Sequence, residues 1–253
     1  MKIFKTSNGA IYEKPCFDSQ YTDETVFGTE ATVLEECGRW MKVRTFYGYE
    51  GYVTSDSVGD GEVGEYVVCA HHTDVLPAPE YQYAPILSIS KGARVVVCEA
   101  EDHGRFFKVE LPDGEIGYVR KSSLKKYCDF GEGEFGDRVV KTAKEYLGAI
   151  YRWGGKSFSG IDCSGLAFMS YYLNGEVIWR DADTDKMTML RETTLDKIKA
   201  GDLIFFPGHV AISLGGLDFI HATAGGNGRV SIERLGDRLK KESVTGVYTL
   251  KTE

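Results

Sequence analysis

The sequence predicts an α+β protein in which two small β-barrels precede a mixed domain of helices and strands. Three observations predict this fold class. The first half repeats itself at an offset of 66 residues, each copy is built of short β-rich runs broken by turn residues, and helical spacing begins only after residue 129. We therefore expect barrels at residues 1–60 and 61–128 and the mixed domain at residues 129–253.

The repeat is clearest in one strand and one corner of each copy. Residues 38–44 (GRWMKVR) align with residues 104–110 (GRFFKVE), and GYV at 51–53 aligns with GYV at 117–119. Short β-rich runs between turn residues are typical of small antiparallel barrels. Two copies are too few for a solenoid or a propeller, so two tandem barrels are the simpler prediction.

The third domain starts after an acidic, glycine-rich linker at residues 129–134. Apolar residues then recur at helical spacing from Phe135 to Leu147, and Gly148 follows as the residue that ends the helix. A second helix is expected at about residues 163–173, where small and apolar residues form a stripe before Asn174-Gly175. Strands are expected at residues 202–206, 209–214, 218–222 and 244–250, the last after a basic amphipathic stretch near 235–241.

Composition excludes several classes of protein. The formal charge is −8 and the pI about 5.3, which argues against a nucleic-acid-binding surface. No segment approaches the roughly 18 apolar residues of a membrane helix, and no apolar run follows the first residues as in a signal peptide. We expect a cytoplasmic protein, or an exported one if a leader was removed. The six cysteines lack zinc-site spacing, so we expect reduced thiols, no metal and no organic cofactor.

One of the six cysteines stands out. Cys163 lies in SGIDCSG, at the start of the predicted second helix, where unpaired N–H groups and the helix dipole favour a thiolate. Its pKa would then fall from about 8.5 toward neutrality. The alternative is a buried, inert thiol, as expected for the other five. The flanking glycines, which allow close approach of a substrate to the backbone, favour the nucleophile.

A cysteine nucleophile needs a base, and two histidines are candidates. His209 begins a predicted strand, and His221 follows twelve residues later across a Gly215-Gly216 hairpin. His221 could orient the imidazole of His209. Because side chains alternate along a strand, the two share a face only if the loop has an odd number of residues or carries a bulge. The alternative is two hydrogen-bonded core histidines.

At this point the chain resembles a known family. YRWGG at 151–155, DCSG at 162–165, GDL at 201–203, GHVAI at 208–212 and FIHA at 219–222 look like the motifs of NlpC/P60 cysteine peptidases, which have a papain-like α+β fold. The repeated first half looks like two bacterial SH3-type (SH3b) barrels. Together the architecture is similar to γ-D-glutamyl-L-diamino acid endopeptidases, which trim murein peptides.

The resemblance implies a role for each matching residue. Cys163 would be the nucleophile, with its own backbone N–H among the oxyanion donors, His209 the base and His221 the third, orienting residue. Tyr151 matches a tyrosine that lines the family's active site. Asp162 and Ser164 match positions that hold the N-terminal end of the substrate. This chain departs from the family at residues 180–182 (RDA), where recycling members can carry RDS, so one hydroxyl contact would be missing.

Asp162 also has an interpretation from its own chemistry. A carboxylate beside a thiolate opposes ionisation of the thiol, so we expect a cation of the ligand, such as the free amine of L-Ala, to neutralise it. The alternative is an N-cap, and both roles could coexist. In the family an SH3b tyrosine contacts the same amine, and Tyr49 in the first barrel is the candidate, with Glu13 as a second. The second barrel has Glu115 in place of Tyr49.

These observations favour a cysteine endopeptidase that hydrolyses the γ-D-Glu to diamino acid bond of murein peptides with a free N-terminal L-Ala. The expected partner is therefore a murein peptide, without nucleic acid or membrane, and the oligomeric state is left open. The alternatives are an exported peptidoglycan hydrolase whose SH3b barrels bind the wall, a non-enzymatic peptide-binding scaffold, and an acyltransferase or amidase on the same fold.

Overall fold

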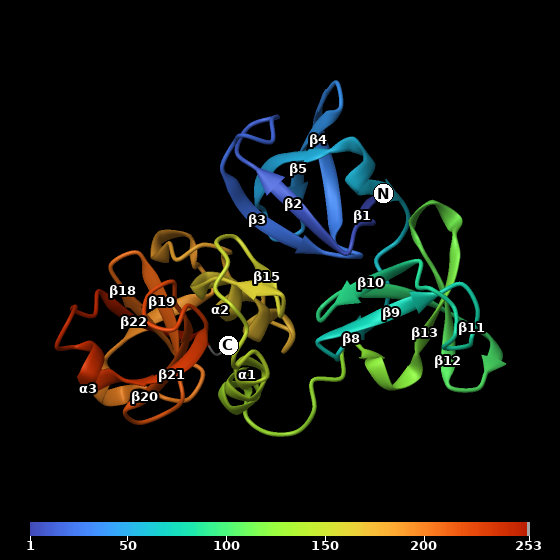
Figure 1. Cartoon of the computed structure of the whole chain (residues 1–253). Helices are drawn as coiled ribbons and strands as arrows, with labels where there is room; N and C mark the ends of the chain where they lie inside the picture. Colours follow the sequence, from blue (N-terminus) through green and yellow to red (C-terminus); the bar gives the residue numbers. More distant parts are fainter. Residues whose placement is uncertain (252–253) are drawn as a thin grey trace. The chain divides into compact units, whose positions relative to one another are not determined.

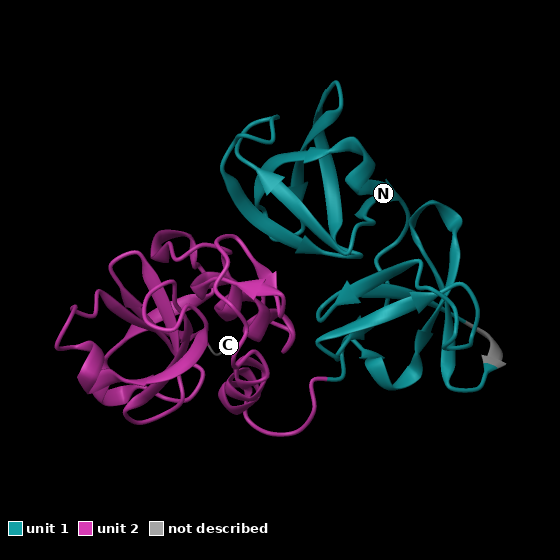
Figure 2. Ribbon diagram, in the orientation of Figure 1, with its two compact units in different colours: residues 1–129 teal, residues 130–253 magenta. Residues whose placement is uncertain are grey.

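The computed structural model describes residues 1–251, apart from the side chains of residues 99–102, and divides them into two compact units. The first unit contains residues 1–129 and the second begins at residue 130 (Figure 2). The third predicted domain runs to residue 253, and residues 252–253 lie outside the described part. No helix in the described part is long and apolar enough to cross a membrane.

The first β-lobe, residues 2–60, is one seven-stranded antiparallel sheet in the order β3-β2-β6-β5-β4-β1-β7 (Figure 1). Alternate residues point inward, and the core contains Phe4, Ile11, Val43 and Val53, each essentially fully buried. The strands are β1 Lys2–Phe4, β2 Asn8–Tyr12, β3 Tyr21–Val26, β4 Glu30–Cys37, β5 Trp40–Thr45, β6 Glu50–Thr54 and β7 Val58–Asp60.

The second β-lobe, residues 66–126, repeats this topology strand for strand, in the order β10-β9-β13-β12-β11-β8-β14. The predicted duplication is therefore confirmed in three dimensions. The strands are β8 Tyr66–Val68, β9 His72–Leu76, β10 Leu87–Ser90, β11 Arg94–His103, β12 Phe106–Glu110, β13 Ile116–Arg120 and β14 Leu124–Lys126. Short 3-10 helices occur at Ser55–Ser57, Pro112–Gly114 and Lys121–Ser123 in this unit, and at Thr184–Lys186 and Leu195–Lys197 in the other.

The two lobes share a core. Val26 and Phe27 belong to the first lobe by sequence, yet they pack in the hydrophobic cluster of the second. The next residue, Gly28, has a φ of 79°, and a Cβ there would come within 2.0 Å of the Arg94 carbonyl oxygen. Asp113 adds a polar clamp, because its carboxylate accepts from the Lys5 ammonium at 2.7 Å and from the Asp60 N–H at 2.8 Å.

The second unit combines three helices with a six-stranded antiparallel sheet in the order β17-β22-β18-β19-β20-β21. The helix α2, buried along almost its whole length, packs on β19 and β20. A helix that is apolar on all sides belongs inside a domain. The elements are α1 Phe135–Lys144, β15 Lys156–Ser157, β16 Gly160–Ile161, α2 Cys163–Tyr172, β17 Leu190–Thr193, β18 Leu203–Phe206, β19 His209–Ser213, β20 Asp218–Ala222, β21 Val230–Arg234, α3 Leu235–Arg238 and β22 Gly246–Leu250.

The sequence predictions for this unit hold for α2 and four strands, and they fail in two places. The first helix ends at Lys144, so Leu147 lies beyond it and is 41% exposed instead of completing the buried stripe. The strands β15, β16, β17 and β21 were not predicted. From Ser231 to Arg234 partly buried and exposed residues alternate, as expected for a strand with one face on the protein.

Candidate active site

Cys163 is the first residue of α2, as predicted, and Asp162 is the N-cap of this helix. The Asp162 carboxylate accepts the N–H of Gly165 at 2.6 Å, so the N-cap interpretation of Asp162 is confirmed. Backbone N–H groups of Val210 and Ser164 donate to the Cys163 sulfur. The sulfur therefore lies between the helix start and β19, where it meets the residue that follows His209 in the chain.

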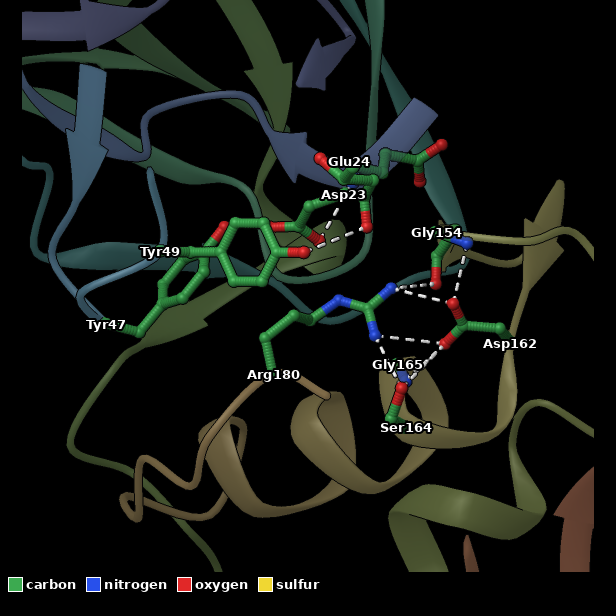
Figure 3. A network of polar contacts seen from close by, with 11 residues as sticks. Asp23, Glu24, Tyr47, Tyr49, Gly154, Asp162, Ser164, Gly165 and Arg180 are labelled. Atoms are coloured by element: carbon green, nitrogen blue, oxygen red, sulfur yellow. Dashed lines mark hydrogen bonds and ion pairs between the residues drawn. The ribbon is translucent and has the colours of Figure 1, made fainter. Parts of the chain in front are cut away.

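Asp162 lies at the centre of a buried polar network, which we call the Asp162 network (Figure 3). Arg180 forms a two-pronged ion pair with it, at 3.0 Å on each carboxylate oxygen. The N–H of Gly154 donates to the same carboxylate at 2.6 Å, and the hydroxyl of Ser164 at 3.3 Å. Two carboxylate oxygens thus accept from five donors once the Gly165 N–H is counted.

Arg180 is fully buried, and its second set of contacts fixes the neighbouring loop. It donates to the Ser164 hydroxyl at 2.8 Å and to the Gly155 carbonyl at 3.3 Å. Gly165 cannot be replaced here, because a Cβ would approach the Gly155 oxygen to 2.2 Å. The expectation that a ligand's cation neutralises Asp162 is therefore wrong in this respect: Arg180 of the chain itself already does so. Contact of Asp162 and Ser164 with a substrate stays a prediction.

The two histidines lie on adjacent strands, β19 and β20. Ser213 pairs with Phe219, which leaves five residues, 214–218, in the connecting loop. An odd count places both imidazoles on one face, as the parity argument required. Their rings meet: Nε2 of His209 lies 2.9 Å from Nδ1 of His221. The prediction that the histidines form a pair is confirmed.

The pKa of the nucleophile candidate differs from the sequence expectation. Burial and the charge of Asp162 raise the pKa of Cys163 to about 11, although the Val210 and Ser164 N–H groups and Arg180 act in the opposite direction. The expected thiolate near neutral pH is therefore wrong. Burial and the cationic Arg238 lower the pKa of His209 to about 4, so this histidine is an uncharged base at neutral pH. Burial, followed by His209, also lowers the pKa of His221, to about 3.

Tyr151 lies in the same site. Burial raises the pKa of its phenol to about 12, and the charges of Cys163 and Asp162 add to the effect, as expected for a phenol beside both groups. Its backbone is held by the Gly228 carbonyl at 2.8 Å and by a bridge to Ile161, the residue before Asp162. A neutral phenol here can donate one hydrogen bond without adding charge.

In the first lobe, the aromatic turn lies beside two buried carboxylates (Figure 3). The Tyr47 hydroxyl donates to Asp23 at 2.6 Å, and Glu24, almost fully buried, accepts from Tyr21 at 3.3 Å. Tyr49 reaches the Thr22 carbonyl at 3.5 Å. Glu13 is exposed and is not among these contacts. The roles of Tyr49 and Glu13 toward a substrate stay predictions, and Asp23 and Glu24 are the acidic residues that sequence reasoning missed.

Two further residues of the second unit were missed. Glu233 on β21 lies 3.4 Å from Nε2 of His221. The alternation V-S-I-E-R was a signal for its strand, but nothing local indicates its partner. Arg180 lies in an irregular segment, and no pattern around it predicts an ion pair with Asp162. Within the described residues no cluster of His, Cys, Asp and Glu could hold a metal ion.

The fold and the site define the class of protein. The sequence model of the NlpC/P60 family matches residues 148–249, the segment that contains α2, both histidines and Glu233. Dipeptidyl-peptidase 6 of Lysinibacillus sphaericus is 38% identical over 242 residues, which cover 90% of this chain and 89% of that one. The chain therefore belongs to the NlpC/P60 family.

Two other relatives agree with this assignment. The γ-D-glutamyl-L-lysine dipeptidyl-peptidase of Bacillus subtilis is 27% identical over 231 residues, which cover 82% of this chain and 74% of that one. A crystal structure of an NlpC/P60 family protein from Bacillus cereus has the same fold, with a TM-score of 0.82 at 22% identity over 98% of both chains. The chain is thus a peptidase of a family of peptidoglycan-related hydrolases.

Proposed function

We propose that this protein is a cysteine peptidase that cleaves the γ-D-Glu to diamino acid bond of murein peptides carrying a free N-terminal L-Ala. The observation that carries this proposal is the placement of the Cys163 sulfur between the start of α2 and the strand of His209, with His221 behind His209. The names of the relatives support the choice of bond, since one is a γ-D-glutamyl-L-lysine dipeptidyl-peptidase.

The positions of the protons on His209 and Cys163 determine how the first step of the reaction proceeds. Nε2 of His209 is engaged by His221, which leaves Nδ1 to receive the thiol proton. Because the thiol is neutral at pH 7, the proton moves to His209 as the sulfur attacks the carbonyl carbon of the scissile amide. The oxyanion forms beside the Cys163 N–H at the helix start. His209 then protonates the leaving amine, and a thioester remains on Cys163.

Water completes the cycle. His209 takes a proton from the water, which attacks the thioester carbonyl, and the thiol leaves with that proton. The products are a dipeptide ending in D-Glu and a peptide beginning with the diamino acid. Tyr151 supplies a neutral donor in the same site, and Arg180 keeps Asp162 and Ser164 in a single geometry beside the nucleophile.

The substrate class rests on the free amine. We propose that this enzyme acts in cell-wall peptide recycling, after an amidase has released the peptide from the glycan, and that the two β-lobes are SH3b barrels. In intact murein the L-Ala amine is acylated and carries no charge. Removing the charge of one partner in a desolvated ion pair typically costs about 2 to 5 kcal/mol, so we expect the free peptide to be favoured over the acylated one roughly 30-fold to several thousand-fold in kcat/KM.

The test is mass spectrometry of L-Ala-γ-D-Glu-diamino acid tripeptides, free or N-acetylated, incubated with the full chain. We expect cleavage of the free peptide by the wild type and by Cys128→Ala, whose exposed thiol is a matched control, and none by Cys163→Ala. Equal kcat/KM for the free and acetylated peptides would overturn the recycling proposal. It would favour the exported wall hydrolase instead, and digestion of intact murein would then be the next measurement.

A further inference from the structure

The polar contacts of His221 continue beyond His209. Nε2 of His221 lies 3.4 Å from Oε2 of Glu233, while Nδ1 faces His209. In the register of β20 and β21, His221 pairs with Ser231 and Phe219 pairs with Glu233. His221 and Glu233 are therefore diagonal neighbours on one face of the sheet, a spacing that long side chains can bridge.

The Glu233 carboxylate also lies beside two cations. Nη1 of Arg238, from α3, lies 3.6 Å from Oε2, and Nζ of Lys241 lies 3.9 Å from Oε1. Arg238 also pairs with Glu242 at 2.9 Å, so its charge is shared between two carboxylates. The side chain of Glu233 is 24% exposed and that of His221 only 2%. The carboxylate thus stands between a buried imidazole and the protein surface.

The direction of the hydrogen bonds follows from what His209 must do. To accept the thiol proton at Nδ1, His209 must carry its own proton on Nε2 and donate it to Nδ1 of His221. His221 must then carry its proton on Nε2, the nitrogen beside Glu233. An ionised carboxylate only accepts hydrogen bonds, so Glu233 stabilises this tautomer of His221 and no other.

We propose that Glu233 is a positioning residue that selects the Nε2–H tautomer of His221 and, through it, the tautomer of His209 that is able to act as a base. This inference rests on the proposed function, since it assigns a fourth member to the same set of residues. The charged groups that act on the imidazole pair are Asp162 from the start of α2 and Arg238 from α3, while Lys241 contacts Glu233 and Glu242 contacts Arg238.

A cavity of about 480 Å³ makes the proposal testable by chemical rescue. It is lined by His221 and Glu233, by Arg238 and Lys241, and by Thr223 and Asn227. Truncation of Glu233 to alanine would leave its place open to this cavity, in contact with two cations. A small carboxylate such as formate can enter a cavity of this size and accept the Nε2 proton in place of Glu233.

The experiment uses the full chain and four variants: Glu233→Ala, Glu233→Gln, Glu233→Asp and the control Glu242→Gln, which alters the Arg238 ion pairs without touching His221. We expect kcat/KM to fall roughly 10- to 100-fold for Glu233→Ala and Glu233→Gln, as for other residues that orient a functional histidine. Glu233→Asp should retain more activity, and Glu242→Gln should resemble the wild type. Formate, but not chloride, should restore activity to Glu233→Ala.

A second readout does not depend on the substrate. NMR of the chain labelled with ¹⁵N-histidine shows which ring nitrogen carries the proton, and we expect Nε2–H for His221 in the wild type and a mixture of tautomers in Glu233→Gln. A wild-type His221 protonated on Nδ1, full activity of Glu233→Ala, or a loss that formate does not restore would overturn the proposal. If the wild type does not cleave murein peptides but shows the Nε2–H tautomer, the proposed substrate fails and this inference stands.

Discussion

The histidine pair on β19 and β20 and the Asp162 network at the start of α2 treat charge in opposite ways. The Asp162 carboxylate is fully paired, because both of its oxygens accept hydrogen bonds from Arg180 and from three other donors. Around His209 the charge is suppressed, because burial and Arg238 lower its pKa to about 4. The first arrangement is rigid and complete, and the second keeps a neutral base and a neutral thiol ready for proton transfer. The start of α2 thus carries the structural Asp162 network and, at the next residue, the Cys163 thiol.

The largest effect should come from removing the base. We expect His209→Ala to lower kcat/KM by about 10,000-fold and His221→Gln by about 100-fold, since the second residue orients the first and transfers no proton itself. Steady-state kinetics on the free tripeptide measure both values. A larger loss in His221→Gln than in His209→Ala would reverse the two roles.

Breaking the Asp162 network should show in stability. Arg180→Met leaves a buried carboxylate without its counter-ion, which costs about 3 to 5 kcal/mol in the unfolding of the second unit. The double variant Asp162→Asn/Arg180→Met removes the charge as well and should recover part of this loss. Denaturant unfolding of the three chains gives the comparison, and equal stability of the wild type and Arg180→Met would show that the ion pair is dispensable.

The rate at which Cys163 reacts with an alkylating reagent should rise with pH, whereas a preformed thiolate would react at a constant rate. With a pKa of about 11, the fraction of Cys163 thiolate rises about tenfold per pH unit from pH 6 to 9. The rate of iodoacetamide labelling at Cys163, resolved by peptide mass spectrometry, should rise in the same way. A rate that is already constant at pH 7 would mean that the helix start outweighs burial and Asp162 after all.

The smallest effect concerns acid stability. The pKa values of His209 and His221, about 4 and about 3, lie below the ordinary value near 6.5 that applies to the unfolded chain. Between these values the unfolded chain binds protons that the folded chain does not, so the free energy of unfolding falls as the pH drops below about 6.5. The slope is at most about 1.4 kcal/mol per pH unit for each histidine. In His209→Ala/His221→Gln this part of the slope should disappear.

The sequence was sufficient wherever the signal is local. The helix start at Cys163 follows from its capping residue. Strand alternation made the shared face of His209 and His221 depend on the loop length, and only the structure gives that length. The partners Arg180 and Glu233 could not be predicted, because each meets its target only after distant segments have packed. The pKa of Cys163 was misjudged for the same reason: the helix start is visible in the sequence, but the burial that opposes it is a tertiary property.

The two β-lobes also show that similar backbones can carry side chains whose contacts the sequence does not predict. Their turns match closely: Gly48 and Gly114 have φ values of 82° and 80°, and each donates to the residue before the turn, Thr45 or Leu111. The side chains on these matching turns make different contacts. The Tyr47 hydroxyl donates a hydrogen bond to Asp23 within the first lobe. Asp113, at the position of Tyr47 in the second lobe, instead accepts from Lys5 and from the Asp60 N–H of the first lobe.

The register of the neighbouring strands extends this difference. The hairpin of β2 and β3 in the first lobe corresponds to the hairpin of β9 and β10 in the second, with Asn8 at the position of His72. By this register Leu87 and Ser88 occupy the positions that Asp23 and Glu24 have in the first lobe. The acidic cluster beside the tyrosines therefore exists in the first lobe alone. The side chains on this face have therefore diverged between the two copies, while the strand order has not.

The shared core of the lobes has a consequence for how the duplication can be handled. Since Phe27 fills the interior of the second lobe, the two copies are no longer interchangeable modules that can be excised or reordered. A fragment cut at residue 60 would carry Phe27 into water and leave a hole around Val95. In calorimetry we therefore expect residues 1–129 to melt as one cooperative block with a single heat-absorption peak, so that the duplication is visible in the topology but not in the thermodynamics.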